Sequence, residues 1–312
     1  MPLTKFQAEV ARLLAGNRTP ESHLAGGAAL HIEPAAFRFS NDLDYFQDSE
    51  ALAVSKARED LAALQQHGYF VNVRLVTGTF TRAVVSRGGD STKVEWCHES
   101  NYRFFPAVPD KRVGWRLHPV DLAINKVSAL AGRQAPRDFL DVIFINRGYL
   151  SLGAMVWASS ERFPGMMPPF LLEQLARQTA VYGPETTAEI QVALDGMKFN
   201  AGSRPSLPAL RMEWIGAVDA ARKLIGWLPE STAGSLFLDK KTGRIVTPRD
   251  ERHLATLKTL QPRAGGVLPA VGESQLLAAD PVARKAFRAN YNLEGAAPTK
   301  RATGNRNKGE QK

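Results

Sequence analysis

The chain has 312 residues, of which 44% are apolar, so it can bury a large core and is long enough for two domains or one domain with an extension. It contains no apolar run of the length that a membrane-spanning helix needs, and its N-terminus lacks the order of a signal peptide, so we expect a cytoplasmic protein. A single cysteine, Cys97, excludes an intrachain disulfide and a multi-cysteine zinc site.

The net charge of +9 and the pI of about 9.7 favour a polyanionic partner. Much of this charge is local, however. The segment from 295 to 312 holds five basic residues and one acid, Glu310, so +4 of the +9 lies there. The rest of the chain is only mildly basic, and we expect this polar, basic tail to be disordered.

In chain order, a helical pattern follows Thr4 and ends at Gly16, and the informative stretch from 24 to 46 comes next. Gly26 and Gly27 precede a short helical run, so their backbone amides could receive an anion such as a phosphate. Asp42 and Asp44 alternate on an expected strand, which places both carboxylates on one face. Paired carboxylates suit magnesium and a nucleotide's phosphates, so the stretch predicts phosphoryl or nucleotidyl transfer.

Either motif alone is also typical of a solvated turn or of punctuation between elements, but their order and spacing favour a site. The run GG, then R-x-S-x-D-x-D with an aromatic residue close behind, resembles the first motif of the AbiEii/AbiGii type nucleotidyltransferase toxins. These toxins belong to the DNA polymerase β-like nucleotidyltransferase superfamily. The resemblance implies an α/β core with a mixed sheet, followed by a mainly helical domain. It also implies phosphate binding by Gly26, Gly27, Arg38 and Ser40, and magnesium-dependent catalysis by Asp42 and Asp44.

A helix capped by Ser49 is expected next, up to about residue 66, and the hydrophobic period then changes to that of strands. The segments 69 to 76 and 79 to 86 form an expected hairpin, and a glycine turn leads into a third strand at 93 to 96. The resemblance assigns Glu95 on this strand as a third metal ligand beside Asp42 and Asp44. The alternative is an ordinary salt bridge from Glu95 to Lys93 or Arg82.

The segment from 101 to 116 mixes prolines, aromatic residues and basic residues. Its rings, Phe104, Phe105 and Trp115, could stack on a base, but large apolar residues are more commonly part of a core.

Two helices are expected between 118 and 148, starting at Pro119 and Pro136, with Lys126 on the polar side of the first. Asp138 and Asp141 are three residues apart and therefore share a face of the second helix. A lysine followed by Arg-Asp-x-x-Asp resembles the later motifs of the same toxin family. The resemblance implies that Lys126 holds the triphosphate and that Asp141 is an essential acid, acting as a base or orienting the acceptor hydroxyl. Helix capping and ion pairing remain the alternative.

Beyond residue 150, helical patterns recur at 151 to 160, 168 to 180, 185 to 197 and 206 to 227. A hairpin is expected at 235 to 248, and further helices at 248 to 260 and 280 to 289. We therefore predict a nucleotidyltransferase core at 1–150, a mainly helical domain at 151–294 and a disordered tail at 295–312.

The resulting hypothesis is a nucleotidyltransferase that uses Mg²⁺ and a nucleoside triphosphate and transfers a nucleotidyl group to an RNA, such as tRNA, or to a protein. The family implies the toxin of a toxin–antitoxin or abortive-infection system, with a cognate antitoxin as partner. Two alternatives stay open. One is a transferase of the same fold that modifies a small molecule such as an antibiotic, and the other is a non-catalytic module that binds nucleic acid or regulates.

Overall fold

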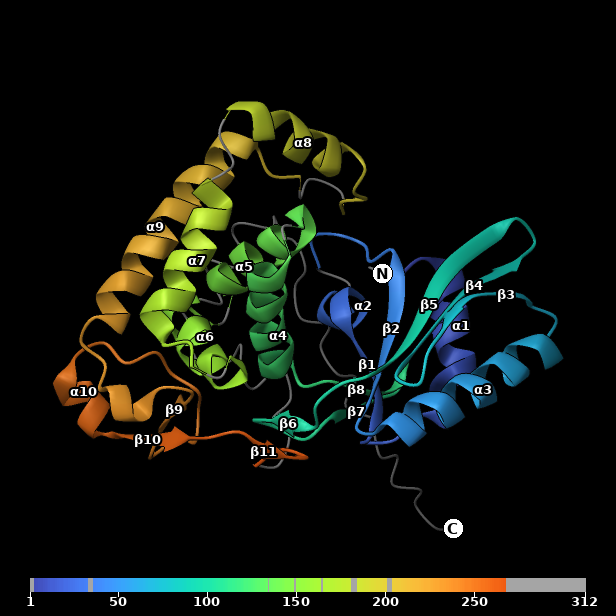
Figure 1. Ribbon diagram of the computed structural model, residues 1–312, viewed down its shortest axis with the longest axis horizontal. Coiled ribbons are helices and arrows are strands. Elements are labelled where there is room, and N and C mark those ends of the chain that lie inside the picture. The colour runs from blue at the N-terminus through green and yellow to red at the C-terminus, as the bar shows by residue number, and fades with distance from the viewer. Residues whose placement is uncertain are drawn as a thin grey trace, which may run out of the picture.

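The computed structural model describes residues 3–32, 36–133, 135–148, 150–163, 165–180, 184–200 and 204–267. A twisted mixed sheet lies on one side of the molecule, and a group of helices lies on the other (Figure 1). This α/β architecture confirms the predicted fold class. The expected helix at 280–289 and the basic tail lie outside the described residues.

The sheet has seven strands, and two of its pairings are parallel. In spatial order it contains β3 (Phe70–Val76), β4 (Phe80–Arg87), β5 (Asp90–His98), β2 (Asp42–Gln47), β1 (Ser22–Ala25), β8 (Gly114–Arg116) and β7 (Val108–Asp110). β2 runs parallel to β5 and β1 runs parallel to β8. Gly88 and Gly89 connect β4 to β5, and both have positive φ angles, as a tight two-residue hairpin turn requires.

Two helices, α1 (Lys5–Leu14) and α3 (Glu50–Gln66), cover one face of the sheet (Figure 1). Their predicted starts are confirmed, since the side chains of Thr4 and Ser49 accept hydrogen bonds from the first turns. In β2 the burial alternates, so Leu43 and Tyr45 are buried while Asp42, Asp44 and Phe46 are half-buried. The aspartates therefore lie on the sheet face away from α1 and α3.

The opposite side of the molecule is helical, as expected. α2 (Gly26–Leu30) lies between the sheet and α4 (Pro119–Gly132), and the helices beyond are α5 (Pro136–Gly148), α6 (Leu152–Ser159), α7 (Pro168–Ala180), α8 (Pro184–Asp195) and α9 (Leu207–Ile225). α6 packs so closely on α9 that a Cβ at Gly153 would lie only 2.9 Å from Leu224 Cδ2. The domain boundary near residue 150 stays a prediction.

Within the described ranges no single helix is long and apolar enough to cross a membrane, and only the bent pair Pro136–Gly148 and Leu152–Arg162 meets that test when taken together.

The predictions for the segment from 235 to 260 were partly wrong. The chain does turn back at Gly243, but its returning arm makes only one bridge, between Leu238 and Ile245. β9 (Leu236–Asp239) pairs instead with β10 (Leu257–Leu260), and the expected helix at 248–260 is reduced to α10 (Glu251–Ala255). Pairing with β9 buries Leu257 and Leu260. A prediction from local helix propensity cannot take account of this contact with a distant strand.

The remaining short elements complete the fold. They are β6 (Tyr102–Arg103), which pairs with β11 (Arg263–Ala264), and the 3₁₀ turns Ala15–Asn17, Ser160–Arg162 and Glu230–Thr232.

The Asp121 carboxylate accepts hydrogen bonds from the backbone amides of Phe104 and Phe105, at 2.8 and 3.0 Å. Both rings are buried, so these two aromatic residues belong to the core and are not a base-stacking surface.

Candidate active site

The three candidate metal-binding acids lie on adjacent parallel strands. Asp42 and Asp44 project from the same face of β2, and Asp44 is directly opposite Glu95 of β5. On the other side of β2, Asp44 is opposite Ala25, the last residue of β1. The strand register therefore brings the acid cluster to the point where β1 ends and the glycine pair begins.

The glycine pair packs directly against Asp44. A Cβ at Gly26 would lie 2.0 Å from Asp44 Oδ2, and its φ of +59° is in the region that favours glycine, so a side chain here is excluded twice. A Cβ at Gly27 would lie 3.1 Å from Ser40 Oγ and 3.4 Å from Arg38 Nη2. The glycine backbone is thus in contact with three of the predicted site residues.

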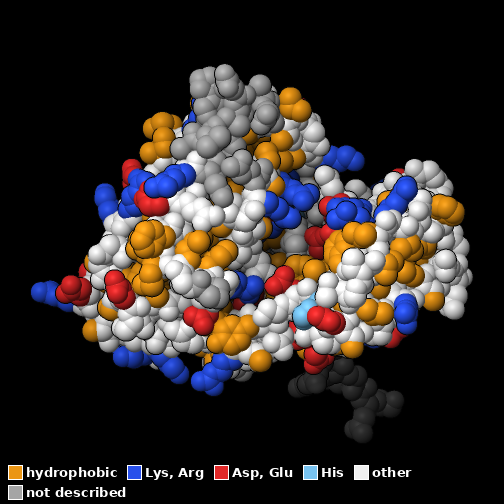
Figure 2. Space-filling view, in the orientation of Figure 1, with side chains coloured by type: hydrophobic (Ala, Val, Ile, Leu, Met, Phe, Trp, Pro, Cys, Tyr) orange, Lys and Arg blue, Asp and Glu red, His pale blue; other side chains and the backbone are white. Residues whose placement is uncertain are grey.

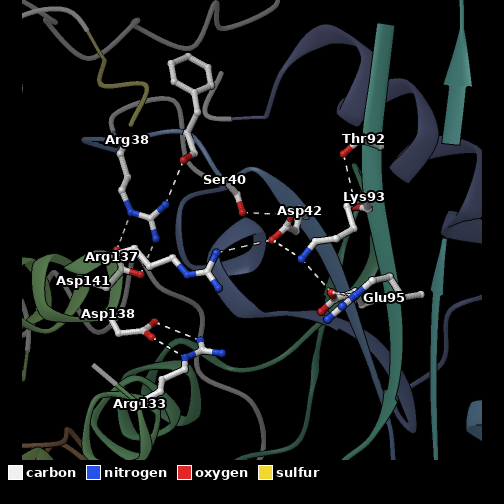
Figure 3. Close-up of polar contacts among 12 residues, drawn as sticks. Arg38, Ser40, Asp42, Thr92, Lys93, Glu95, Arg133, Arg137, Asp138 and Asp141 are labelled. Carbon is white, nitrogen blue, oxygen red and sulfur yellow. Dashed lines mark hydrogen bonds and ion pairs between the residues drawn. The ribbon is translucent and has the colours of Figure 1, made fainter. Parts of the chain in front are cut away.

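Lys93 occupies the space between two of the acids (Figure 3). Its Nζ lies 3.0 Å from Asp42 Oδ2 and 2.8 Å from Glu95 Oε1, and Arg82 Nε donates to Glu95 Oε1 at 2.7 Å. Burial would raise the pKa of Glu95, but Lys93 and Arg82 outweigh it, so the pKa is lowered. The salt bridges expected as the alternative for Glu95 are therefore both present.

Asp44 differs from its neighbours in having no counterion. Within the part of the chain that the structure describes, its carboxylate has no hydrogen-bond or ion-pair partner. Burial, together with the charges of Glu95 and Asp42, raises the pKa of Asp44 to about 6. Lys126 and Lys93 lower this pKa only in part, so a carboxylate with two acids nearby and no direct partner is a position where a cation would be favourable.

The acid cluster fits a divalent cation in its chemistry and only partly in its geometry. Carboxylate oxygens are the ligands that Mg²⁺ prefers, and Asp44 lacks a cation. However, no three His, Cys, Asp or Glu side chains among the described residues are gathered around one point, because Lys93 and Arg82 hold Glu95. Asp44 is therefore the ligand without a competing ion pair, while Asp42 and Glu95 would both have to exchange Lys93 for the metal.

A buried ionic cluster forms the opposite, helical wall of the site. Asp141 on α5 accepts two hydrogen bonds from Arg38, at 2.8 and 2.6 Å, and lies 2.8 Å from Lys126 Nζ. Asp138 lies 3.0 Å from Lys126 Nζ and accepts from Arg133 at 2.8 Å. Lys126 is only 6% exposed, so it faces this cluster and not the polar side expected from the sequence.

The electrostatics of Asp141 are the reverse of those of Asp44. Burial alone would raise the pKa of Asp141, but Arg38 and Lys126 outweigh burial and hold the pKa well below its usual value. His31 Nε2 is also 2.8 Å from Asp141 Oδ1, and burial and Arg38 lower the pKa of His31 to about 4, against the pull of Asp141. His31 is therefore a neutral hydrogen-bond donor to Asp141 at neutral pH, a role that no sequence motif indicated.

The two walls enclose a cleft of about 640 Å³. In the space-filling view it is the hollow in the middle of the molecule, where basic and acidic side chains gather (Figure 2). Its lining includes all the predicted nucleotide- and metal-binding residues: Gly26, Gly27, Arg38, Ser40, Asp42, Asp44, Glu95 and Lys126. Residues about 150 positions apart, such as Asp44 on β2 and Ala193 near the end of α8, line the same cleft.

Two arginines in the cleft were not predicted as site residues. Arg133 and Arg137 flank the start of α5, and both side chains are about half exposed. Arg137 points toward the acids, with Nη1 3.7 Å from Asp42 Oδ2 (Figure 3). Their spacing of four residues, on either side of Pro136, was the available signal in the sequence.

No protein-family model and no curated protein matches the chain. Among solved structures, JHP933 from Helicobacter pylori is similar over 72% of this chain and 95% of its own, with 17% identity and a TM-score of 0.44. MenT4, a nucleotidyltransferase toxin from Mycobacterium tuberculosis, is similar over 92% of this chain and 90% of its own, with 12% identity and a TM-score of 0.46. At these identities and TM-scores, neither likeness supports an argument about this chain.

Proposed function

We propose that this protein is a magnesium-dependent nucleotidyltransferase that uses a nucleoside triphosphate. The observation that carries the proposal is the close approach of Gly26 to Asp44, where a Cβ would lie 2.0 Å from the carboxylate. A phosphate on the glycine amides would consequently touch the acid pair and face Arg38 and Arg137 across the cleft. Such a meeting of backbone amides, acids and guanidinium groups is what nucleotidyl transfer needs, because positioning and charge neutralisation supply most of the catalysis.

In the reaction, an acceptor hydroxyl oxygen forms a bond to the α-phosphorus while the bond from that phosphorus to the bridging oxygen breaks, pyrophosphate leaves and the hydroxyl proton is released to solvent. Magnesium, when bound by Asp42 and Asp44, supplies neutralisation of the charge on the phosphate oxygens. Gly26, Gly27 and Ser40 contact the triphosphate from the sheet side. Arg133 and Arg137 contact it from the helical wall, since both are exposed to the cleft.

Asp141 acts in this proposal as a positioning residue. Its oxygens accept from Arg38 and His31 and pair with Lys126, so none is left to take a proton from an acceptor hydroxyl. Its contribution is to fix Arg38 and Lys126 at the cleft, where Lys126 adds a positive charge below the phosphates. The alternative role of Asp141 as a base is less consistent with a pKa held well below the usual value.

The biological role that we propose is that of a toxin in a toxin–antitoxin or abortive-infection system, with an RNA or a protein as acceptor. This part of the proposal is supported by the resemblance of the GG and R-x-S-x-D-x-D motifs to the AbiEii/AbiGii type toxins. A cognate antitoxin as partner follows from the same resemblance, and the proposed cytoplasmic location rests on the sequence expectation given above.

The proposal is tested by incubating the purified protein with Mg²⁺, each α-labelled triphosphate in turn and total cellular RNA and protein. We expect label to enter one acceptor fraction, and Asp44→Asn to reduce this transfer at least a thousandfold, because metal ions contribute several kcal/mol to such reactions. Asp90→Asn is the matched control, since Asp90 is an exposed aspartate at a turn. Transfer that persists in Asp44→Asn, or no transfer with any triphosphate, would contradict the proposal.

A further inference from the structure

The acid row of the sheet is followed by a second row of different chemistry. Asp44, Glu95 and Arg82 lie side by side on β2, β5 and β4. The next row on the same face consists of Phe46 on β2, Cys97 on β5 and Phe80 on β4, which are likewise in register. All six line the cleft, and the two phenylalanines are half-buried. We call Phe46, Cys97, Phe80 and the neighbouring Arg82 the sheet shelf.

The position of the shelf follows from the direction of the proposed reaction. In an in-line displacement the attacking oxygen and the leaving group lie on opposite sides of the phosphorus. The triphosphate would be held where β1 ends, at Gly26 and Gly27, so pyrophosphate leaves on that side of Asp44. The acceptor must then approach from the other side of Asp44, over β5 and β4, and that is where the shelf lies.

The side chains of the shelf favour a nucleic acid. Phe80 and Phe46 present aromatic surface to the cleft, and the Arg82 guanidinium carbon lies 5.1 Å from the centre of the Phe80 ring. Arg82 donates its Nε to Glu95 and is 41% exposed, so its terminal guanidinium nitrogens can pair with a phosphate while a base stacks beside it. In the space-filling view, hydrophobic side chains over these strands border the charged hollow (Figure 2).

A peptide acceptor is favoured less by the same surface. Peptides that bind to sheets commonly use main-chain hydrogen bonds to a free strand edge. β4 lies between β3 and β5, and β5 lies between β4 and β2, so both strands already pair on both sides. The shelf therefore offers side chains alone, and a single-stranded nucleic acid offers the open base faces that such rings bind.

We propose that the sheet shelf binds the terminal base and phosphate of a single-stranded RNA acceptor, with Phe80 as the stacking residue and Arg82 as the phosphate ligand. This inference rests on the proposed function, because the direction of approach comes from the transfer reaction. It assigns an acceptor subsite that is distinct from the triphosphate-binding residues at Gly26, Gly27, Arg133 and Arg137.

The test measures the binding of a short, fluorescein-labelled single-stranded RNA by anisotropy, with Mg²⁺ and a non-hydrolysable triphosphate analogue present. We expect Phe80→Leu, which keeps an apolar side chain but removes the ring, to weaken RNA binding about tenfold, as the loss of one base–aromatic stack does. Phe80→Tyr keeps the ring and should bind as the wild type does. Phe70→Leu is the matched control, since Phe70 is 68% exposed on the outer strand β3 and lies outside the cleft lining.

Binding of the analogue, measured separately by calorimetry, distinguishes this inference from the proposed function. We expect Phe80→Leu to bind the analogue as tightly as the wild type. Unchanged RNA affinity in Phe80→Leu would overturn the shelf as the acceptor subsite, and so would a wild-type protein that binds the analogue but no RNA. A loss of analogue binding in Phe80→Leu would assign the ring to the incoming nucleotide, and a loss only of transfer to protein would assign it to a peptide. If the wild type bound no analogue at all, the proposed function itself would fail.

Discussion

The two walls of the cleft treat their aspartates in opposite ways. On the helical wall, Asp141 is surrounded by Arg38, Lys126 and His31, and its pKa is held well below the usual value. On the sheet wall, Asp44 has acids as neighbours, and its pKa is raised to about 6. Both carboxylates are part of the resemblance motifs, but one already has its cations and the other lacks one. The difference is consistent with the proposal that Asp141 positions Arg38 and Lys126 and that Asp44 is a metal ligand.

The largest effect on stability is expected at Asp141. Asp141→Asn would leave Arg38 and Lys126 with one buried partner fewer, so we expect a loss of about 3–5 kcal/mol in the free energy of unfolding. For a chain of this size, this corresponds to a melting temperature lower by roughly 10 °C. Calorimetry against Asp90→Asn, the exposed control, measures it. An unchanged melting temperature together with lost activity would instead favour Asp141 as a base.

The opposite sign is expected at Asp44. Without metal, Asp44→Asn removes a carboxylate whose pKa is raised from 3.8 to about 6, so the variant should be more stable than the wild type by about 3 kcal/mol at neutral pH. A raised carboxyl pKa means that the wild type loses stability as the pH rises from about 4 to about 6. The gain of the variant should accordingly vanish below about pH 4. Denaturant unfolding across this pH range measures the difference in stability. A variant less stable than the wild type at pH 7 would refute the interpretation that the Asp44 carboxylate is electrostatically unfavourable without metal.

A smaller effect is expected at Lys93, which lies between Asp42 and Glu95 as a divalent cation would. Lys93→Met removes this competing charge, and at about 3 Å in a water-like medium such a charge amounts to roughly a tenfold change in affinity. We therefore expect Mn²⁺ to bind Lys93→Met about tenfold more tightly than the wild type in the absence of nucleotide, as measured by electron paramagnetic resonance. Lys56→Met, on the outer helix α3, should bind as the wild type does. Weaker binding in Lys93→Met would contradict the competition.

The sequence was sufficient to predict many local elements and to name residues that line one cleft. The alternation in β2, the caps at Thr4 and Ser49 and the glycine turns are local signals, and the structure confirms them. Pairings between distant segments were not accessible. The strand at Leu257–Leu260 is formed by its contact with β9, and Lys126 is buried because two acids of the next helix turn toward it.

The same limit applied to the roles of the site residues. Glu95 lies beside Asp44, and both salt bridges expected as its alternative, to Lys93 and Arg82, are present, but the sequence could not decide between ion pairing and a ligand role. The spacing of Arg133 and Arg137 was visible in the sequence, but their position in the cleft depends on how α5 approaches the sheet, which that spacing does not encode.

The measurement that tests the account most directly is calorimetric titration of the protein with non-hydrolysable analogues of the four nucleoside triphosphates. Each titration is done with Mg²⁺ and again with EDTA, for the wild type and for a variant carrying both Asp42→Asn and Asp44→Asn. The account predicts that at least one analogue binds the wild type with Mg²⁺ and that this binding is lost with EDTA and in the variant. Binding that is equally tight without Mg²⁺ and without the two aspartates, or no binding of any analogue, would contradict it.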